Sequence, residues 1–227
     1  MHIFFDFDGT LVDSSEGIHI ALVNACKQVG IKGPELNEFR ACIGPPIQEI
    51  IHRLIPEIEH DQLEAIRVGF RSEYDQRYYS RVKWHQGVIE GLTRLHALDG
   101  TSLSIVTNKP TQPTNALLSE AGITNLFKSV MGVDYRVKNG NGPIFGSKKE
   151  AICYALDFTD CPSTQAVYVG DTISDQKACQ ASGVEFVAAT YGFHLWHPQE
   201  LMGFQAAGSF EEVVRCLEQK VSDTIRF

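Results

Sequence analysis

The sequence has no excess of positive charge. Its 227 residues include 20 Lys and Arg against 28 Asp and Glu, which gives a formal net charge of −8 at pH 7. Proteins that bind DNA or RNA derive much of their affinity from Lys and Arg side chains that neutralise phosphates. The acidic balance therefore argues against nucleic acid as the main partner. Any phosphate is expected to be bound singly, in a local site in which a divalent cation can take part.

Long apolar runs and paired cysteines are also missing. No hydrophobic stretch approaches the roughly 18 residues that a membrane-spanning helix needs, and the opening MHIFFDFDGT lacks the basic segment of a signal peptide. The six cysteines include no CxxC pair and no zinc-type cluster with histidine. We therefore expect a cytoplasmic protein with no membrane partner, whose cysteines are buried free thiols in a reducing compartment.

The overall composition is that of a globular protein. Hydrophobic residues make up 43%, charged residues 21% and aromatic residues 10%, which excludes a disordered or collagen-like chain. A chain of this length buries roughly 70–75% of its unfolded surface, so it needs no disulfide or metal to fold. The length allows one large domain, or one domain with an inserted module.

Short β-prone apolar runs alternate with amphipathic segments over most of the chain. This alternation predicts an α/β fold with a doubly wound, mostly parallel sheet, in which ligands gather at the carboxyl ends of the strands. The expected strands cover residues 3–5, 103–106, 130–133, 166–169 and 185–188, and the expected helices cover 112–121, 148–156, 174–182 and 209–220.

The pattern changes between residues 14 and 81. Apolar residues recur there at helical spacing, and no convincing strand is present. Helices are expected over residues 18–26, 35–42, 46–55 and 60–79. We therefore expect an all-α domain over residues 14–81, inserted into an α/β domain that comprises residues 1–13 and 82–227.

Two carboxylates follow the first expected strand, in the segment Asp6-Phe7-Asp8-Gly9-Thr10. Residues two apart on an extended chain point to the same side. Because like charges this close raise each other's pKa, one carboxylate can act as a nucleophile while the other holds a proton and acts as a general acid. Gly9 permits a sharp turn of the chain after the strand, which leaves backbone N–H groups free to bind an anion. The alternative interpretation is an Asx turn that only ends the strand.

Two later strand ends also carry polar side chains. Thr107 and Asn108 follow one strand and suit phosphoryl oxygens, while Asp171 follows another and Asp175 lies one helical turn later. Mg²⁺ prefers oxygen ligands and is usually shared between one or two carboxylates, substrate phosphate and water. Because these strand ends meet at one edge of a parallel sheet, the combination predicts a Mg²⁺-assisted phosphate site there.

This combination resembles the haloacid dehalogenase (HAD) superfamily of Mg²⁺-dependent phosphotransferases. The segment DFDGTLVDS resembles the first motif of that family, TNK at Thr107–Lys109 the second, and GDTISD at Gly170–Asp175 the fourth. The segment WHQGVIEGLTRL resembles the phosphoglycolate phosphatase-like branch. The resemblance covers about residues 3–192. It implies a Rossmann-like core and identifies the insert at residues 14–81 with the family's α-helical cap.

The resemblance also implies a role for each motif residue. Asp6 would be the nucleophile that becomes an aspartyl phosphate, and Asp8 would be the general acid and base. The Asp6 side chain, the Asp8 backbone carbonyl and the Asp171 side chain would hold Mg²⁺. The remaining assignments are phosphate binding by Thr107 and Asn108, and support of the metal site by Asp175 and Thr10.

The third family motif is a lysine that neutralises the nucleophile and binds the phosphoryl oxygens. The sequence departs here from the commonest pattern, in which Pro-x-Pro follows that lysine, and the candidates are Lys138, Lys148 and Lys149. We favour Lys148, because it opens the helical segment KKEAICYAL and can project toward the strand edge. Lys109 is interpreted as a flank of the second motif rather than as the catalytic cation.

The presence of Asp8 decides the expected reaction. Dehalogenase members lack an acid at this position, because a departing halide needs no proton. We therefore expect a Mg²⁺-dependent phosphatase that acts on a small phosphorylated metabolite, such as phosphoglycolate, a sugar phosphate or a nucleotide. The alternatives are a phosphomutase of the same superfamily and a non-catalytic phosphate-binding or regulatory protein. A receiver domain is disfavoured by the DxD spacing and the long insert, and the sequence leaves the oligomeric state open.

Overall fold

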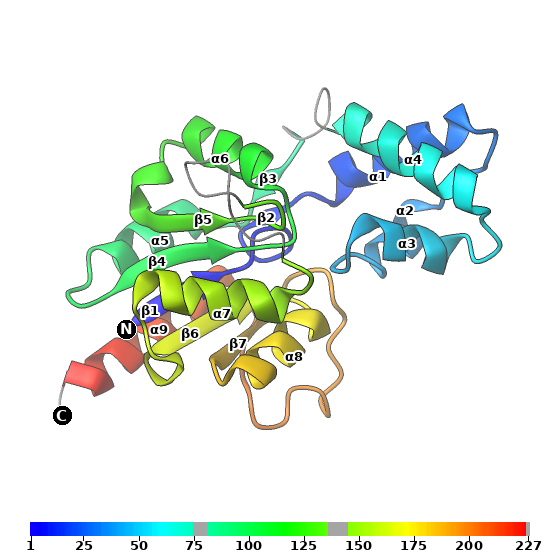
Figure 1. The fold of residues 1–227 in the computed structure, drawn as a ribbon. Helices are drawn as coiled ribbons and strands as arrows, with labels where there is room; N and C mark the ends of the chain where they lie inside the picture. Colours follow the sequence, from blue (N-terminus) through cyan, green and yellow to red (C-terminus); the bar gives the residue numbers. More distant parts are fainter. Residues whose placement is uncertain (75–80, 136–144, 226–227) are drawn as a thin grey trace. The chain divides into compact units, whose positions relative to one another are not determined.

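The chain divides into two compact units (Figure 1). The computed structural model describes residues 1–74, 81–135 and 145–225. One unit combines Met1–Val12 with Trp84–Phe227, and the other comprises Asp13–Lys83. Short strands β2 (Val12–Asp13) and β3 (Lys83–Trp84) pair with each other where the chain passes from one unit to the other and returns.

A six-stranded parallel sheet lies at the centre of the first unit, with the strand order β5-β4-β1-β6-β7-β8. Its strands are β1 (His2–Phe5), β4 (Ser102–Val106), β5 (Phe127–Met131), β6 (Ala166–Gly170), β7 (Glu185–Ala189) and β8 (Gln205–Ala207). The central strand β1 pairs with β4 on one side and β6 on the other, and Phe5 lies opposite Ile105 and Val169. These three strands therefore end side by side.

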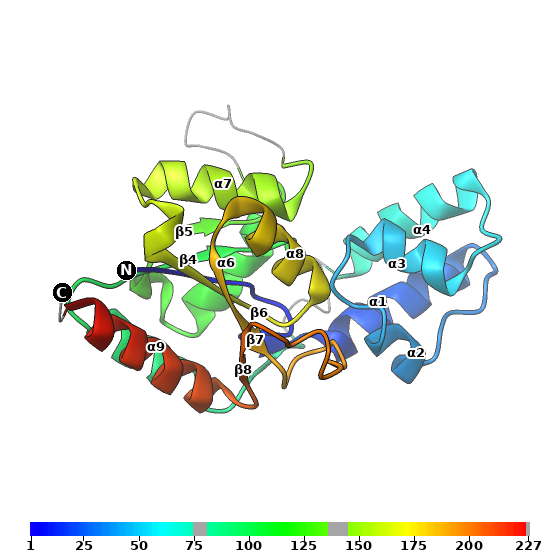
Figure 2. The same ribbon diagram turned by 90° about the horizontal axis from the view of Figure 1, so that it is seen from below.

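Helices cover both faces of this sheet (Figures 1 and 2). Helix α7 (Lys148–Thr159) packs against α8 (Ile173–Ser182), and α5 (Val88–His96) packs against α9 (Phe210–Ile225), while α6 (Thr111–Glu120) lies beside β5. Successive side chains of a strand point to opposite faces. Phe4 accordingly lies in the core cluster under α7 and α8, whereas the Phe5 ring lies 6.1 Å from the Phe210 ring of α9.

The second unit has its own hydrophobic core. Its helices are α1 (Ser15–Gln28), α2 (Leu36–Arg40), α3 (Ile47–Leu54) and α4 (His60–Glu73). The side chains of Leu22, Phe39, Ile51 and Ile66 are completely or almost completely buried between them. Because α1 and α4 pack along each other, residues distant in the sequence share this core.

The predicted fold class is confirmed, since the sheet is parallel and helices cover both of its faces. One expected strand was misplaced. Strand β5 runs over Phe127–Met131 rather than over residues 130–133, because pairing with β4 aligns Phe127 with Leu103 and Met131 with Val106. Strand β8 is not predicted from the sequence, because its residues Gln205–Ala207 include no β-branched or aromatic side chain. Pairing with β7 makes this segment a strand despite its low propensity.

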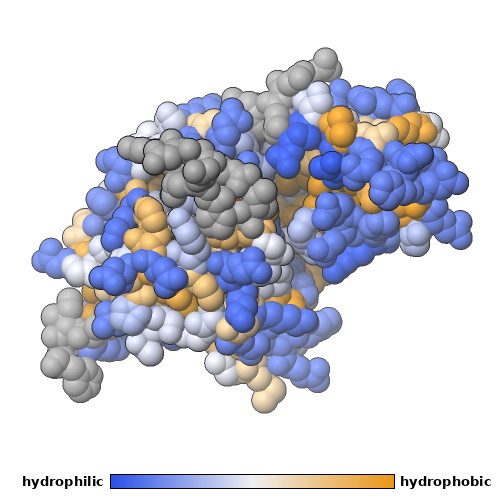
Figure 3. Space-filling view, in the orientation of Figure 1, coloured by the Kyte–Doolittle hydropathy of each residue, from blue (hydrophilic) through white to orange (hydrophobic). Residues whose placement is uncertain are grey.

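Hydrophilic residues cover most of the face drawn in Figure 3, with smaller hydrophobic groups between them. Among the described helices, none combines the length and the apolar character that crossing a membrane would require.

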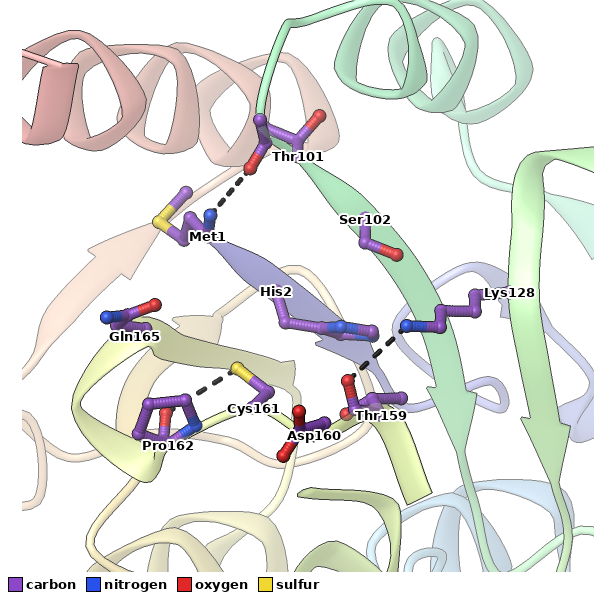
Figure 4. A pocket seen from close by; sticks show the side chains of 11 residues that line it. Met1, His2, Thr101, Ser102, Lys128, Thr159, Asp160, Cys161, Pro162 and Gln165 are labelled. Carbon is purple, nitrogen blue, oxygen red and sulfur yellow. Dashed lines mark hydrogen bonds between the residues drawn. The ribbon is translucent and has the colours of Figure 1, made fainter. Parts of the chain in front are cut away.

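His2 lies in a buried polar network at the amino-terminal edge of the sheet. Its Nε2 atom is 2.9 Å from the Ser104 hydroxyl oxygen, and its ring stacks on Phe4 at a centroid distance of 4.4 Å. It borders a shallow, open pocket (Figure 4) that Lys128 also lines. Burial, together with the positive charge of Lys128, lowers the pKa of His2 from 6.5 to about 4. The imidazole is therefore neutral in the folded protein at neutral pH.

We expect His2 to make the stability of the protein depend on pH. Between pH 6.5 and 4 the unfolded chain binds a proton at His2 that the folded chain does not, so the free energy of unfolding falls as the pH falls. At roughly 1.4 kcal/mol per unit of pKa shift, the loss is at most about 3.5 kcal/mol. Urea denaturation at several pH values should show a flatter profile for His2→Gln than for the wild type.

The matched control is His60→Gln, at a histidine whose side chain is 84% exposed. This variant should keep the wild-type profile. Superimposable profiles for His2→Gln and the wild type would contradict the assignment.

Candidate active site

Strand β1 brings Asp6 and Asp8 to the carboxyl-terminal edge of the sheet. The Asp6 amide continues the pairing by donating to the Val169 carbonyl at 2.9 Å, and the Phe7 amide donates to Asp6 Oδ1 at 2.8 Å. The chain then turns at Gly9, which has a φ of +85°. A Cβ at Gly9 would lie 2.1 Å from Asp171 Oδ2. Glycine is therefore required both by the backbone conformation and by the close approach of Asp171.

Lys148 lies at the start of α7 and is buried between two carboxylates. Its side chain is 4% exposed, and its Nζ donates to Asp6 Oδ2 at 2.6 Å and also to Asp175 Oδ1. Burial alone would lower the pKa of Lys148, but the charges of Asp175 and Asp6 outweigh it and raise the pKa above its ordinary value. Lys148 is therefore a buried ammonium group with two anionic partners.

Of the candidate lysines within the described residues, Lys148 lies against Asp6. Lys149 is exposed. Lys138 lies outside the described residues. The Ser147 hydroxyl accepts a hydrogen bond from the Glu150 amide at 3.3 Å and caps α7, which fixes where the helix begins and hence where Lys148 projects.

Asp171 follows β6 and is completely buried. Its Oδ1 accepts a hydrogen bond from the Thr10 hydroxyl at 3.0 Å, and its Oδ2 accepts one from the Phe193 amide at 2.8 Å. Thr10 is itself held by the Tyr191 hydroxyl, which donates to the Thr10 carbonyl at 2.8 Å. A Cβ at Gly192 would lie 2.2 Å from the Asp171 Cβ, so this second glycine also makes room for the carboxylate.

Asp175 has a double role in the first turn of α8. Its carboxylate accepts hydrogen bonds from the Thr172 amide at 2.9 Å and from the Thr172 hydroxyl at 2.6 Å, and its own amide donates back to that hydroxyl. This capping box fixes the start of α8. The same carboxylate is the second anionic partner of Lys148, so helix capping and the site share one side chain.

Asp6, Asp171 and Asp175 form a buried acidic cluster, in which one ligand atom from each residue lies within 4.8 Å of the others. Burial raises the pKa of Asp6 to about 6, with Lys148 opposing the shift and Asp175 adding to it. Burial, Asp175 and Asp6 raise the pKa of Asp171 well above its ordinary value. A bound cation would favour the ionised forms of both groups. Carboxylate oxygens are ligands that suit a hard divalent cation such as Mg²⁺.

Thr107 and Asn108 lie in the turn after β4. Thr107 is buried, its amide donates to the Met131 carbonyl at 2.9 Å, and its hydroxyl accepts a hydrogen bond from the Lys109 amide at 3.2 Å. The Thr107 side chain also lowers the pKa of Asp6, which places it beside that carboxylate. Asn108 is partly buried in the same turn.

The side chain of Asp8 has a different cationic partner, Lys109. The Lys109 Nζ lies 3.0 Å from Asp8 Oδ1 and 3.3 Å from Oδ2. The Lys109 side chain is 2% exposed, and that of Asp8 is 19% exposed. From the sequence, Lys109 is expected only to flank the second motif. Its position directly after Thr107-Asn108, at the same strand edge as the carboxylates, was the signal that could have identified it.

The site therefore pairs two ammonium groups with different carboxylates. Lys148 joins Asp6 and Asp175, whereas Lys109 joins Asp8. This arrangement can present a carboxylate nucleophile beside a fixed positive charge and a second, partly accessible carboxylate from the same strand end. Enzymes that transfer an anionic group from one oxygen atom to another use such a nucleophile, together with a fixed positive charge and an acid or base.

Comparison with known proteins gives a consistent result. The chain is 32% identical over 205 residues to a phosphoglycolate phosphatase from Aliivibrio fischeri (strain ATCC 700601 / ES114), covering 86% of each protein. It is 29% identical over 203 residues to a phosphoglycolate phosphatase from Pseudomonas savastanoi pv. phaseolicola, covering 86% of this chain and 71% of the relative.

A solved haloacid dehalogenase-like hydrolase from Streptococcus pneumoniae matches the fold with a TM-score of 0.80 and 27% identity, over 94% of this chain and 97% of the other. The family model for haloacid dehalogenase-like hydrolases matches residues 3–189. The predictions of the superfamily and of a hydrolytic enzyme are thus confirmed: the chain belongs to the haloacid dehalogenase-like hydrolase family.

Proposed function

We propose that the protein is a Mg²⁺-dependent phosphatase that hydrolyses a small phosphorylated metabolite through an aspartyl-phosphate intermediate. The observation that carries this proposal is the buried Asp6 carboxylate, 2.6 Å from the Lys148 ammonium at the end of the central strand. Thr107 and Asp171 lie at the ends of the two neighbouring strands. The phosphatase names of the relatives support the same reaction class.

In the first step, an Asp6 oxygen attacks phosphorus and the bond from phosphorus to the leaving oxygen breaks. With a pKa of about 6, Asp6 is mostly ionised at neutral pH and available as the nucleophile. Lys148 offsets the charge of Asp6 and of the phosphoryl oxygens as they approach. Protonated Asp8 gives its proton to the leaving oxygen, so that the product departs as an alcohol.

In the second step, ionised Asp8 takes a proton from a water molecule, whose oxygen attacks the phosphorus of the intermediate. The bond between phosphorus and Asp6 breaks, inorganic phosphate forms, and Asp8 is again protonated. The 19% exposure of the Asp8 side chain suits this exchange, because the group must reach both the leaving oxygen and water. Thr107 and Asn108 would bind the phosphoryl oxygens in both steps.

Charge balance supports a divalent cation. Among the described residues, the site holds four carboxylates, Asp6, Asp8, Asp171 and Asp175, and two ammonium groups, Lys109 and Lys148. The excess is two negative charges when Asp8 is ionised and one when it holds its proton, and it grows when a phosphate binds, so that one Mg²⁺ ion would offset it. The Asp6 and Asp171 side chains and the Asp8 carbonyl would hold it, while Thr10 and Asp175 support the site. When bound, Mg²⁺ neutralises charge on the transferring phosphoryl group.

The names of the relatives favour phosphoglycolate as the first substrate to test, with sugar phosphates and nucleotides next. A phosphomutase would use the same strand-end residues but would not release inorganic phosphate continuously, so phosphate release separates the two. All six cysteines are free thiols. This state suits the cytoplasmic location that is part of the proposal.

We expect Asp6→Asn to abolish phosphate release, because an amide is not a nucleophile for phosphorus. Phosphate should be measured with phosphoglycolate and with p-nitrophenyl phosphate, in Mg²⁺ and in EDTA. The wild type should turn over in Mg²⁺ and stop in EDTA, and Asp6→Asn should lose at least about 10³-fold.

The matched control is Asp157→Asn, at an exposed carboxylate on α7, which should keep wild-type rates. Wild-type rates in Asp6→Asn would contradict the assignment of the nucleophile. A wild type that releases phosphate equally well in EDTA would contradict the role of the metal.

We expect Lys148→Met to lower both activity and stability. Removing the ammonium leaves Asp6 and Asp175 buried without it, which should cost about 3–5 kcal/mol in the free energy of unfolding. The loss of charge beside the nucleophile should lower kcat by about 10²–10³-fold. Urea denaturation and steady-state kinetics measure the two effects. Exposed Lys149→Met is the matched control, and equal effects at the two lysines would rule out the assignment of Lys148.

A further inference from the structure

We propose that Lys109 is a positioning residue that holds the Asp8 carboxylate in the orientation needed to protonate the leaving oxygen. This inference rests on the proposed phosphatase function. It starts from the contact between the two groups, in which Lys109 Nζ lies 3.0 Å and 3.3 Å from the two oxygens of Asp8. Contact with both oxygens restricts rotation of the carboxylate in a way that contact with one oxygen would not.

The exposure of the two side chains shows from which side Lys109 acts. The Lys109 side chain is 2% exposed, against 19% for Asp8. Lysine is almost never buried to this extent without a partner, and here the partner is Asp8. Lys109 therefore contacts Asp8 from the protein interior and leaves part of the Asp8 side chain accessible. A group that holds an acid from behind can orient it without occupying the place of the substrate.

The polypeptide around Lys109 is itself held in place. A Cβ at Gly132 would lie 2.4 Å from both the Lys109 carbonyl oxygen and the Thr111 amide nitrogen, so the segment packs directly on the chain after β5. The Gly132 amide donates to the Thr111 hydroxyl at 3.2 Å, and the Thr111 amide donates to Asp134 Oδ1 at 2.7 Å. These contacts fix the backbone at Lys109, so its side chain starts from a defined position.

The side chain of Lys109 is also confined on the strand side. Its Nζ lies 5.8 Å from the centre of the Phe7 ring, within the range of a cation–π contact. Phe7 is completely buried and immediately precedes Asp8. The ammonium therefore has a defined position relative to the backbone of the residue that it orients.

The two buried lysines of the site thus have different roles. Lys148 contacts the nucleophile Asp6, whereas Lys109 contacts the acid Asp8. A positioning role of this kind predicts a substrate-dependent loss when Lys109 is removed. An alkoxide leaving group needs a proton to depart, but p-nitrophenolate departs readily without one. Misplacing Asp8 should therefore slow hydrolysis of an alkyl phosphate much more than hydrolysis of an aryl phosphate.

The experiment compares kcat/KM of the wild type, Lys109→Met and Lys109→Arg with phosphoglycolate and with p-nitrophenyl phosphate in Mg²⁺. This ratio reports the steps up to departure of the leaving group, so slow hydrolysis of the intermediate does not mask the difference. Lys109→Met should lose about 10²-fold or more with phosphoglycolate and less than about 10-fold with p-nitrophenyl phosphate. Lys109→Arg keeps the charge and should recover part of the loss.

A double-mutant cycle with Asp8→Asn tests whether Lys109 acts through Asp8. Once Asp8 has been replaced, Lys109→Met should have little further effect on kcat/KM. Equal losses with the two substrates, or independent losses in the double variant, would overturn the positioning role while the phosphatase function stands. A wild type that releases no phosphate from either substrate would overturn the phosphatase function, and this inference with it.

Discussion

The buried ammonium of Lys148 is the interaction on which the rest of the site depends. It comes from α7 and contacts Asp6, which follows β1, and Asp175, which lies in α8. Carrying these carboxylates from water into the protein interior is costly unless opposite charge and hydrogen bonds compensate. One lysine thereby fixes three elements relative to one another. It also opposes the rise in the pKa of Asp6, the proposed nucleophile, that burial causes.

The parallel sheet makes this concentration of charge possible. Apolar residues on both faces of β1 lie under helices, so the strand is entirely buried. Apart from His2 at its start, its polar neighbours in the sequence lie where the strand ends. The carboxyl ends of β4, β1 and β6 then lie side by side and bring Thr107, Asp6 and Asp171 to one edge. The glycines at positions 9 and 192 give the backbone room to approach Asp171 closely. Hydrophobic packing thus determines where the polar groups meet.

The sequence predicted the sheet and its main helices because apolar runs and amphipathic segments are local signals. It failed for β8, where only pairing with β7 makes Gln205–Ala207 a strand. In the site, Asp6 and Lys148 could be proposed from their places at a strand end and a helix start. The choice of Asp8 as the partner of Lys109 and the hydrogen bond from the Phe193 amide to Asp171 could not. Both depend on segments distant in the sequence, whose approach no local pattern encodes.

The measurement that tests the account most directly is a search for phosphate bound covalently to Asp6. Asp8→Asn should slow hydrolysis of the intermediate, because no carboxylate remains to activate water. Quenching that variant during turnover of p-nitrophenyl phosphate, whose leaving group needs no acid, and reducing it with borohydride should convert Asp6 to homoserine, which mass spectrometry of the peptide that contains position 6 identifies. The account predicts homoserine at position 6, only after incubation with substrate and Mg²⁺. Phosphate turnover with an unmodified Asp6, or modification of a different residue, would contradict it.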